Sequence, residues 1–303
     1  MSELCLGTVQ FGMKYGINNK FGQPSERECF EILDLALENG ISVIDTARAY
    51  GTSELVLGHY IEQKGYHNRL EFISKLRPNI IEKGVMDKYT IIRNECEDSL
   101  KRLHINKLKG YLLHTPEYIY DNEIVNSLQR LKQEGLVENI GVSIYDIKEG
   151  FYAIEKGVDY IQLPYNILDQ RGEQTGFIEK AKMAGIKIFV RSAFLQGLFM
   201  MEINEIPLYL KRAKPYLMDF EKLLHEYDAN KIESLLQFIK MNDQIDFLVL
   251  GVDTCQQLKE DICYFRKKSV LKEQFNNKLK EQFKDVDEHV ILPSLWSGGK
   301  KAD

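Results

Sequence analysis

Residues 41–51 read Ile-Ser-Val-Ile-Asp-Thr-Ala-Arg-Ala-Tyr-Gly, a short apolar run followed directly by a polar segment. An apolar run of this length between helical stretches is typical of a buried parallel strand. Asp45 ends this run, and Tyr50 follows five positions later. Lys75 and His114 end two later apolar runs in the same way. Polar residues in such positions usually face the functional mouth of an α/β barrel.

Eight short apolar runs recur along the chain, with helical patterns between them. They are Leu4–Thr8, Ser42–Asp45, Glu71–Ser74, Gly110–Leu113, Ile140–Ser143, Tyr160–Leu163, Lys187–Val190 and Phe247–Leu250. This alternation predicts a parallel sheet, and eight repeats favour a closed (β/α)8 TIM barrel over an open doubly wound sheet. We expect residues 1–303 to form one domain, with a substrate-side insertion at about 198–246 and a charged C-terminal tail that ends in a frayed segment.

Composition excludes several classes of protein. Hydrophobic residues make up 44% of the 303 residues, and the formal net charge is −5 with no basic cluster, which argues against a nucleic-acid partner. The five cysteines form no CxxC pair, which suits free thiols in a reducing compartment. Neither a signal-peptide pattern nor an apolar run of about 18 residues is present. We therefore expect a cytoplasmic protein that binds no membrane.

Helix boundaries carry recognisable signals. Ser25 and Glu28 have the spacing of a capping box at the start of a helix. Gly40, Gly135 and Gly185 each stand between a helical pattern and a strand, where a left-handed residue commonly ends a helix. These signals support the alternation of helices and strands.

Residues 44–58 resemble the signature of the aldo-keto reductase family, which is Asp-Thr-Ala, then Tyr-Gly, then Ser-Glu and Leu-Gly. Lys75 and His114 follow in the order of that family's third and fourth barrel strands. The resemblance runs from Leu6 to about Asp261. It implies an NAD(P)-dependent enzyme that interconverts a small-molecule aldehyde or ketone and its alcohol, and a carbonyl derived from a sugar is one candidate substrate. The family is frequently monomeric, and the sequence leaves the oligomeric state and the physiological direction open.

The resemblance implies that Tyr50 is the general acid/base and that Lys75, Asp45 and His114 complete a catalytic tetrad. A phenol has a pKa of about 10 and is a poor acid/base near neutrality. We expect the Lys75 ammonium to lower that pKa and Asp45 to keep the ammonium charged. His114 would hydrogen-bond the substrate oxygen. No side chain can donate a hydride, so a nicotinamide cofactor is required.

Each of these four residues could also have an ordinary structural role. A lone Asp at a strand end often caps a helix, and a lone Lys there is often a solvated rim residue. A lone His is commonly a core group, and a Tyr beside Gly is usually loop packing. Four such coincidences in family order are much less probable than one.

The resemblance also implies a cofactor site. Its residues are Gly7, Thr8, Val9, Asp45, Ser143, Gln162, Arg191, Ser192, Phe194, Gln196, Gly197, Gly251, Thr254, Gln257, Glu260 and Asp261. Arg191 takes the place of a Tyr that stacks on nicotinamide in many relatives; a barrel-rim ion pair is the alternative. Ile144 stands where relatives often have Asn. Relatives specific for NADP usually have Lys or Arg at the positions of Gly251 and Gln257, so NADP is favoured by the family alone and NAD stays open.

Substrate identity depends on loops rather than on the tetrad. We expect the mouth to include Phe11, Tyr15 and three aromatics of the insertion, Phe199, Tyr209 and Tyr216, which would suit a sugar. These aromatics could equally fill the insertion's own small core. Two other functions are a nucleotide-binding regulatory subunit with little turnover, which an intact tetrad disfavours, and a barrel lyase or isomerase that uses no nucleotide.

Overall fold

Eight parallel strands close into a barrel, as the sequence predicts. The computed structural model describes all residues except 1, 67, 83, 269–272 and 297–303, and the expected frayed tail lies outside the described residues. The strands are β1 (Glu3–Gly7), β2 (Val43–Asp45), β3 (Glu71–Leu76), β4 (Leu108–Leu113), β5 (Val137–Ser143), β6 (Tyr160–Pro164), β7 (Lys187–Arg191) and β8 (Phe247–Gly251). Each strand pairs with its sequence neighbour, and β1 pairs with β8 to close the ring.

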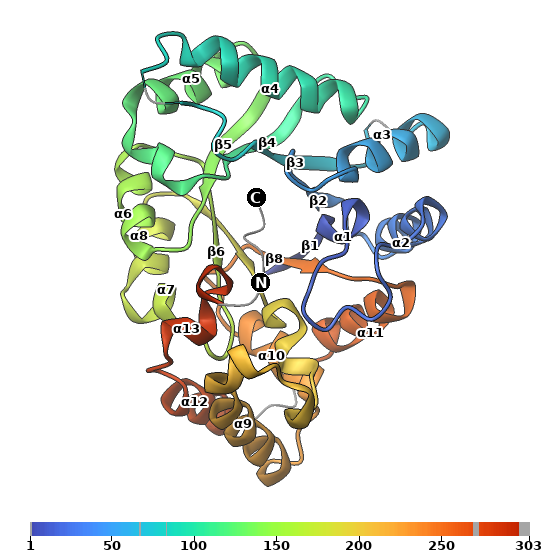
Figure 1. Ribbon diagram of the computed structural model, residues 1–303, viewed down its shortest axis with the longest axis vertical. Helices are drawn as coiled ribbons and strands as arrows, with labels where there is room; N and C mark the ends of the chain where they lie inside the picture. Colours follow the sequence, from blue (N-terminus) through green and yellow to red (C-terminus); the bar gives the residue numbers. More distant parts are fainter. Residues whose placement is uncertain (1, 67, 83, 269–272, 297–303) are drawn as a thin grey trace.

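Helices surround this barrel (Figure 1). They are α1 (Val9–Gly12), α2 (Glu26–Glu38), α3 (Ser53–Lys64), α4 (Lys88–Arg102), α5 (Asn122–Gln133), α6 (Ile147–Glu155), α7 (Arg171–Gln174), α8 (Phe177–Met183), α9 (Lys214–Glu226), α10 (Lys231–Lys240), α11 (Cys255–Arg266), α12 (Glu273–Gln282) and α13 (Glu288–Ile291). Short 3₁₀ turns η1–η5 cover Pro116–Tyr120, Leu195–Met200, Ile203–Glu205, Leu208–Ala213 and Pro293–Leu295.

The predicted helix boundaries are confirmed. Ser25 and Glu28 form a capping box at the start of α2, in which the Ser25 N–H donates to Glu28 Oε2 at 2.7 Å. Gly40, Gly135 and Gly185 have positive φ angles of 71°, 79° and 78°, a region that glycine enters without steric cost. Local sequence chemistry therefore places these ends of the helices.

Two apolar clusters follow from the alternation of side chains along the strands. One faces outward and packs against the helices. The other fills the barrel interior and consists of Cys5, Val43, Ile73, Leu112, Tyr160 and Phe189, with Phe247 and Val249 against it. Phe189 stacks on Phe247 with ring centroids 4.5 Å apart. Since successive strand residues point to opposite faces, the residue two positions beyond each interior side chain also points inward.

The segment after β7 contains η2, η3, η4, α9 and α10, and α9 lies near α12 in the lower part of Figure 1. Phe220 of α9 packs edge-on against Phe283, just beyond α12, and against Phe199 of η2. Phe199 is therefore a core residue of this segment, and the prediction that it lines the mouth is wrong. The charged C-terminal segment contains α12 and α13, joined by irregular residues 283–287, and the turn η5.

Candidate active site

Eight residues singled out in the sequence form a ring at the C-terminal end of the barrel. Seven of them lie two positions beyond a side chain of the interior cluster, and Ser143 lies two positions beyond Gly141 on β5, so the strand alternation brings all of them to one layer. They are Gly7, Asp45, Lys75, His114, Ser143, Gln162, Arg191 and Gly251. One position from every strand thus contributes to this layer, which is the usual place of function in such barrels.

Lys75 is wholly buried and is held by Asp45. Its Nζ donates to Asp45 Oδ1 at 2.7 Å and Oδ2 at 2.8 Å, and also to the backbone carbonyl of Thr46 at 2.9 Å. Burying either charge alone would be costly, whereas the paired and hydrogen-bonded groups compensate each other. The Lys75 ammonium lies 3.4 Å from the Tyr50 hydroxyl and donates to it.

Tyr50 comes from the loop between β2 and α3, which two glycines hold against α1. A Cβ on Gly12 would lie 1.6 Å from the Tyr50 carbonyl oxygen, and a Cβ on Gly51 would lie 2.2 Å from the carbonyl oxygen of Gly12. Gly51 also has a φ of 54°. Both glycines are required for this close approach, which fixes the backbone that carries the phenol.

Tyr50 retains its proton more firmly than the sequence analysis expects. Burial raises the pKa of Tyr50 well above its ordinary value, the Asp45 carboxylate adds to this, and Arg191 opposes it. The sequence predicts a lowered pKa, but burial outweighs any stabilisation of the phenolate by the neighbouring Lys75 ammonium, which Asp45 already binds through two short hydrogen bonds. At neutral pH the Tyr50 phenol therefore carries its proton.

His114 follows β4 and stands beside Tyr50. Their rings meet edge to face, with centroids 5.7 Å apart. Burial, followed by the charges of Lys75 and Arg191, lowers the pKa of His114 to about 3. The imidazole is therefore neutral near pH 7 and can donate one hydrogen bond. Its Nδ1 is buried and has no hydrogen-bond partner among the described residues.

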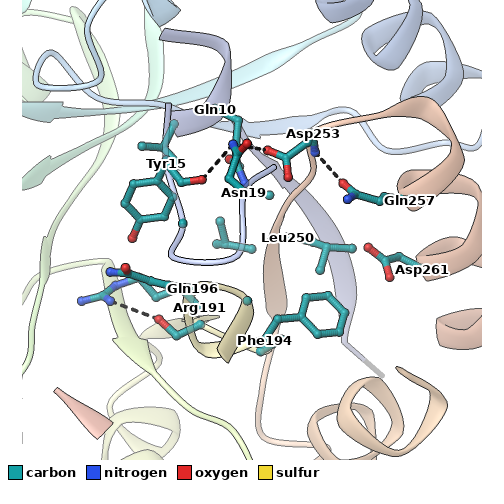
Figure 2. Close-up of a pocket in the computed structure, with 18 of the residues that line it drawn as sticks. Gln10, Tyr15, Asn19, Arg191, Phe194, Gln196, Leu250, Asp253, Gln257 and Asp261 are labelled. Atoms are coloured by element: carbon teal, nitrogen blue, oxygen red, sulfur yellow. Dashed lines mark hydrogen bonds between the residues drawn. The ribbon is translucent and has the colours of Figure 1, made fainter. Parts of the chain in front are cut away.

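A cavity of about 330 Å³ extends from Tyr50 and Asp45 along the loops after β7 and β8. Figure 2 shows Tyr15, Gln196 and Arg191 on one side of it and Gln10, Asp253 and Asp261 on the other. Most of the residues that the resemblance assigns to a cofactor line this cavity. They are Gly7, Thr8, Val9, Asp45, Arg191, Ser192, Phe194, Gln196, Gly197, Gly251, Gln257, Glu260 and Asp261.

Ser143, Gln162 and Thr254 do not line the cavity. Gln162 donates from Nε2 to Asp45 Oδ2 at 2.7 Å, and Ser143 donates to Gln162 Oε1 at 3.3 Å, so both stand behind the Lys75–Asp45 pair. The Thr254 hydroxyl accepts the Gln257 N–H at 3.2 Å and caps α11. The Thr254 side chain therefore serves as the N-cap of α11.

A strap of residues 13–22 crosses the cavity and was not recognised in the sequence beyond Tyr15. Its Ile17 N–H donates to the Gln196 carbonyl at 3.0 Å. Asn19 donates from Nδ2 to Asp253 Oδ1 at 3.0 Å (Figure 2). Gly197, with a φ of 87°, lies so close that a Cβ there would be 2.9 Å from Asn18 Cβ. Gly197 thus makes room for the strap, and only tertiary contacts reveal these residues.

The expected mouth aromatics separate into two groups. Tyr15 lines the cavity, whereas Phe11 is fully buried in the outer core, so the prediction for Phe11 is wrong. Tyr209 is exposed on the surface, and the Tyr216 hydroxyl accepts the Asp287 N–H at 3.4 Å. From the segment after β7, Ala193, Met200 and Ile232 are added to the lining already named.

The far end of the cavity is acidic. Asp253, Glu260 and Asp261 line it, and Arg191 is the only cation among the described lining residues. Burial raises the pKa of Asp261 to about 7, and the Glu260 carboxylate adds to this shift. The Gln257 side chain is occupied, since its Oε1 accepts the Asp253 N–H at 2.7 Å.

These features fit an extended nucleotide ligand. Gln10 lines the cavity, and its buried Oε1 has no hydrogen-bond partner among the described residues. Gly251 is a close-approach position, because a Cβ there would meet the Gln10 side chain at 2.6 Å. A dinucleotide that binds close to the protein backbone needs small residues that allow this approach and unpaired polar groups that can bind it.

Neither a metal cluster nor a helix able to cross a membrane occurs in the part of the chain that the structure describes. All five cysteines are free thiols. Cys5, Cys29 and Cys96 are buried, and Cys263 is exposed.

Comparison with known proteins agrees with this geometry. The model of the Aldo/keto reductase family matches residues 3–283. The aldo-keto reductase YhdN of Bacillus subtilis is 28% identical over 67% of this chain, and the match spans 62% of YhdN, less than two thirds of its length. The uncharacterized oxidoreductase YrpG of the same organism is 25% identical over 86% of both chains. In fold, the holo form of aldo-keto reductase AKR11C1 from Bacillus halodurans is similar, with a TM-score of 0.72, 22% identity and 95% of each chain covered.

Proposed function

The chain belongs to the aldo/keto reductase family, and from this premise we propose that it reduces an aldehyde or ketone with a nicotinamide dinucleotide, using Tyr50 as the proton donor. The observation that carries the proposal is the contact of Tyr50 with the buried Lys75–Asp45 pair beside neutral His114. A carbonyl oxygen placed between the phenol and the imidazole would meet two hydrogen-bond donors, which polarise the carbonyl.

The chain's own residues handle the proton. Tyr50 donates it to the carbonyl oxygen as negative charge develops there, and Lys75 stabilises the phenolate that remains. Asp45 keeps Lys75 in place and charged, and His114 orients the carbonyl. The reduced nicotinamide supplies the hydride when it is bound. Gly7, Val9 and the loops after β7 and β8 would hold it.

The raised pKa of Tyr50 suits the acid that carbonyl reduction needs. A phenol that keeps its proton at neutral pH is ready to act as an acid, whereas alcohol oxidation needs the phenolate as a base. We therefore propose carbonyl reduction as the main reaction of this site, in the cytoplasm, where five free thiols stay reduced.

The cofactor is the open part of the proposal. Family resemblance favours NADP, but the Asp253 and Glu260 carboxylates at the far end of the cavity would repel a 2′-phosphate, Asp261 is only partly ionised near pH 7, and no described lining residue there is cationic. Asp253 could instead accept a hydrogen bond from a ribose hydroxyl. These charges favour NAD, and both cofactors belong in the test.

The test is a fluorescence titration with NADH and NADPH, followed by a screen of aldehydes and ketones with the cofactor that binds. The Tyr50→Phe variant should bind the cofactor as the wild type does and lose about 10²- to 10⁴-fold in turnover, because it lacks only the transferable proton.

Turnover in Tyr50→Phe close to the wild-type value would remove Tyr50 from this role. Tight cofactor binding without turnover of any carbonyl by the wild type would instead support a nucleotide-binding regulatory subunit. Failure of both cofactors to bind would support a barrel lyase or isomerase.

A further inference from the structure

Arg191 is a cation with no counterion at the reacting end of the cavity. It ends β7 and lines the cavity together with Tyr50 and Asp45. No carboxylate of the described residues makes an ion pair with it, so the rim ion pair considered in the sequence analysis is absent among them. A guanidinium is always charged and carries five donors. Partly removing a cation from water without a counterion destabilises the free protein. An anionic ligand that binds there would supply the missing charge and remove this cost.

The surrounding residues hold Arg191 without neutralising it. One Nη donates to the Ile144 carbonyl at 3.2 Å and the other to the Ser192 hydroxyl at 3.4 Å. The guanidinium carbon lies 4.2 Å from the centroid of the Tyr145 ring, which covers one face of the group. Two neutral acceptors and one ring leave the second face and the remaining N–H edges for ligands. Ile144 supplies a carbonyl here, although its side chain lacks the amide common in relatives.

The charges at this end of the cavity do not balance. Lys75 and Asp45 cancel each other through their buried pair. His114 is neutral near pH 7, and Tyr50 keeps its proton. Arg191 therefore leaves one positive charge among groups that mostly donate hydrogen bonds. The three carboxylates at the far end stand away from it, as Figure 2 shows for Asp253 and Asp261.

From this arrangement we propose that Arg191 binds an anionic group, a carboxylate or a phosphate, carried by the carbonyl substrate. The planar guanidinium matches both groups with paired N–H donors. The inference rests on the proposed function, because it places the carbonyl at Tyr50 and His114 and the anion at Arg191. It narrows the substrate from any aldehyde or ketone to an acidic one, which an oxidised or phosphorylated sugar would satisfy.

The test compares matched anionic and neutral aldehydes in the wild type and in Arg191→Met. The pairs are glyoxylate and methylglyoxal, succinic semialdehyde and butanal, and 4-carboxybenzaldehyde and 4-formylbenzamide, which differ in the spacing between carbonyl and charge. We expect kcat/KM to favour the anionic member of at least one pair by about 10- to 100-fold in the wild type, the range of a charged hydrogen-bond contact. Arg191→Met should abolish this preference, and Arg191→Lys should restore part of it, since lysine keeps the charge but not the fork.

Lys20→Met is the matched control. It removes the same charge from the strap, but this side chain is 69% exposed and pairs with Glu205 on the surface. Its substrate preference should equal that of the wild type. No preference in any pair, or a preference that survives in Arg191→Met, would overturn the proposal while leaving carbonyl reduction intact.

Two binding measurements distinguish a substrate contact of Arg191 from a cofactor contact. If Arg191 serves the cofactor pyrophosphate, Arg191→Met should weaken NADH or NADPH binding in a fluorescence titration and leave the substrate preference unchanged, which contradicts the proposal. If the wild type turns over no aldehyde, the proposed function fails. Calorimetry of 4-carboxybenzaldehyde with protein saturated in oxidised cofactor still decides the role of Arg191: binding by the wild type and not by Arg191→Met supports it, and equal binding refutes it.

Discussion

Tyr50 and Lys75 illustrate how burial changes the chemistry of a residue. An exposed ammonium beside a phenol would favour the phenolate. Here Asp45 takes two of the three N–H groups of Lys75 and the Thr46 carbonyl takes another, at distances from 2.7 to 2.9 Å. Since these acceptors take all three N–H groups, the 3.4 Å contact with Tyr50 shares one of them and is weak. The Lys75–Asp45 pair is therefore nearly neutral as a whole, and we expect its ammonium to stabilise negative charge that develops on the Tyr50 oxygen.

Carbonyl reduction should be independent of pH between about pH 5 and pH 9. The pKa of Tyr50 is raised, so its acid form persists throughout this range and is lost only as the pH rises above its ordinary value. The pKa of His114 is lowered to about 3, so its neutral form persists down to that pH. The measurement is the pH profile of kcat/KM for the carbonyl substrate at saturating cofactor, so that the titration of Asp261 near pH 7 at the far end of the cavity does not enter it. A fall centred between about pH 6 and pH 8 would mean that another group carries the proton.

Lys75→Met should destabilise the protein by about 3–5 kcal/mol, because it leaves the Asp45 carboxylate buried without its counterion. Asp45 is only 2% exposed, and Gln162 is its remaining side-chain donor. Urea unfolding measures this free energy. The double variant Asp45→Asn/Lys75→Met should regain most of the loss while staying inactive. A single variant as stable as the wild type would show that water reaches Asp45.

At the level of elements, the site depends on two backbone segments in contact. The end of α1 meets the loop that carries Tyr50 at Gly12 and Gly51, and neither position has space for a Cβ. The same loop is tied through Ser53, whose N–H donates to the Tyr50 carbonyl at 3.0 Å and whose hydroxyl donates to Thr8 at 2.9 Å. Gly12 and Gly51 thus position the Tyr50 side chain through the backbone alone.

Gly12→Ala should lower kcat/KM by about 100-fold, since a shift of about 1 Å in a reacting group can have that effect. The new Cβ would overlap the Tyr50 carbonyl oxygen and displace the loop. Steady-state kinetics measures the loss, and the crystal structure of the variant measures the shift. Gly65→Ala, at a φ of 68° with no atom within 4 Å of the new Cβ, is the control. It should cost about 1–2 kcal/mol of stability and leave kcat/KM unchanged.

At the scale of the whole molecule, the apolar cluster inside the barrel lies directly below the polar residues of the site. Phe189 lies in its inner cluster, 4.5 Å from Phe247 and 5.0 Å from Tyr160 by ring centroids. The next inward position on the same strand is Arg191, and the next one beyond Tyr160 is Gln162. Packing of these rings therefore sets the height and direction of the polar layer above them.

Phe189→Ala should reduce the free energy of unfolding by about 3–5 kcal/mol, because it leaves a cavity in a closed interior that cannot collapse. Chemical denaturation measures the change. Leu208→Ala, at a side chain 82% exposed on the segment after β7, should stay within about 0.5 kcal/mol of the wild type. A loss below about 2 kcal/mol at Phe189 would show that the strands can close around the gap.

The sequence by itself determined the eight strands, the helix ends at Ser25 and Gly40, and the place of Asp45, Lys75 and His114 at strand ends. These are local properties: apolar period, capping chemistry and the alternation of strand faces act over a few residues. The position of Arg191 at the mouth followed from the family resemblance, in which it takes the place of a Tyr.

Only the tertiary structure decided which polar groups are already committed and which remain available. Asp45 neutralises Lys75 across 30 positions and Asn19 meets Asp253 across 234, so neither contact follows from local spacing. The same packing placed Phe11 and Phe199 in the core and Gln162 behind Asp45. Burial and charge pairing depend on every segment that surrounds a group. For this reason the raised pKa of Tyr50 and the absence of a counterion for Arg191 can be read only from the folded structure.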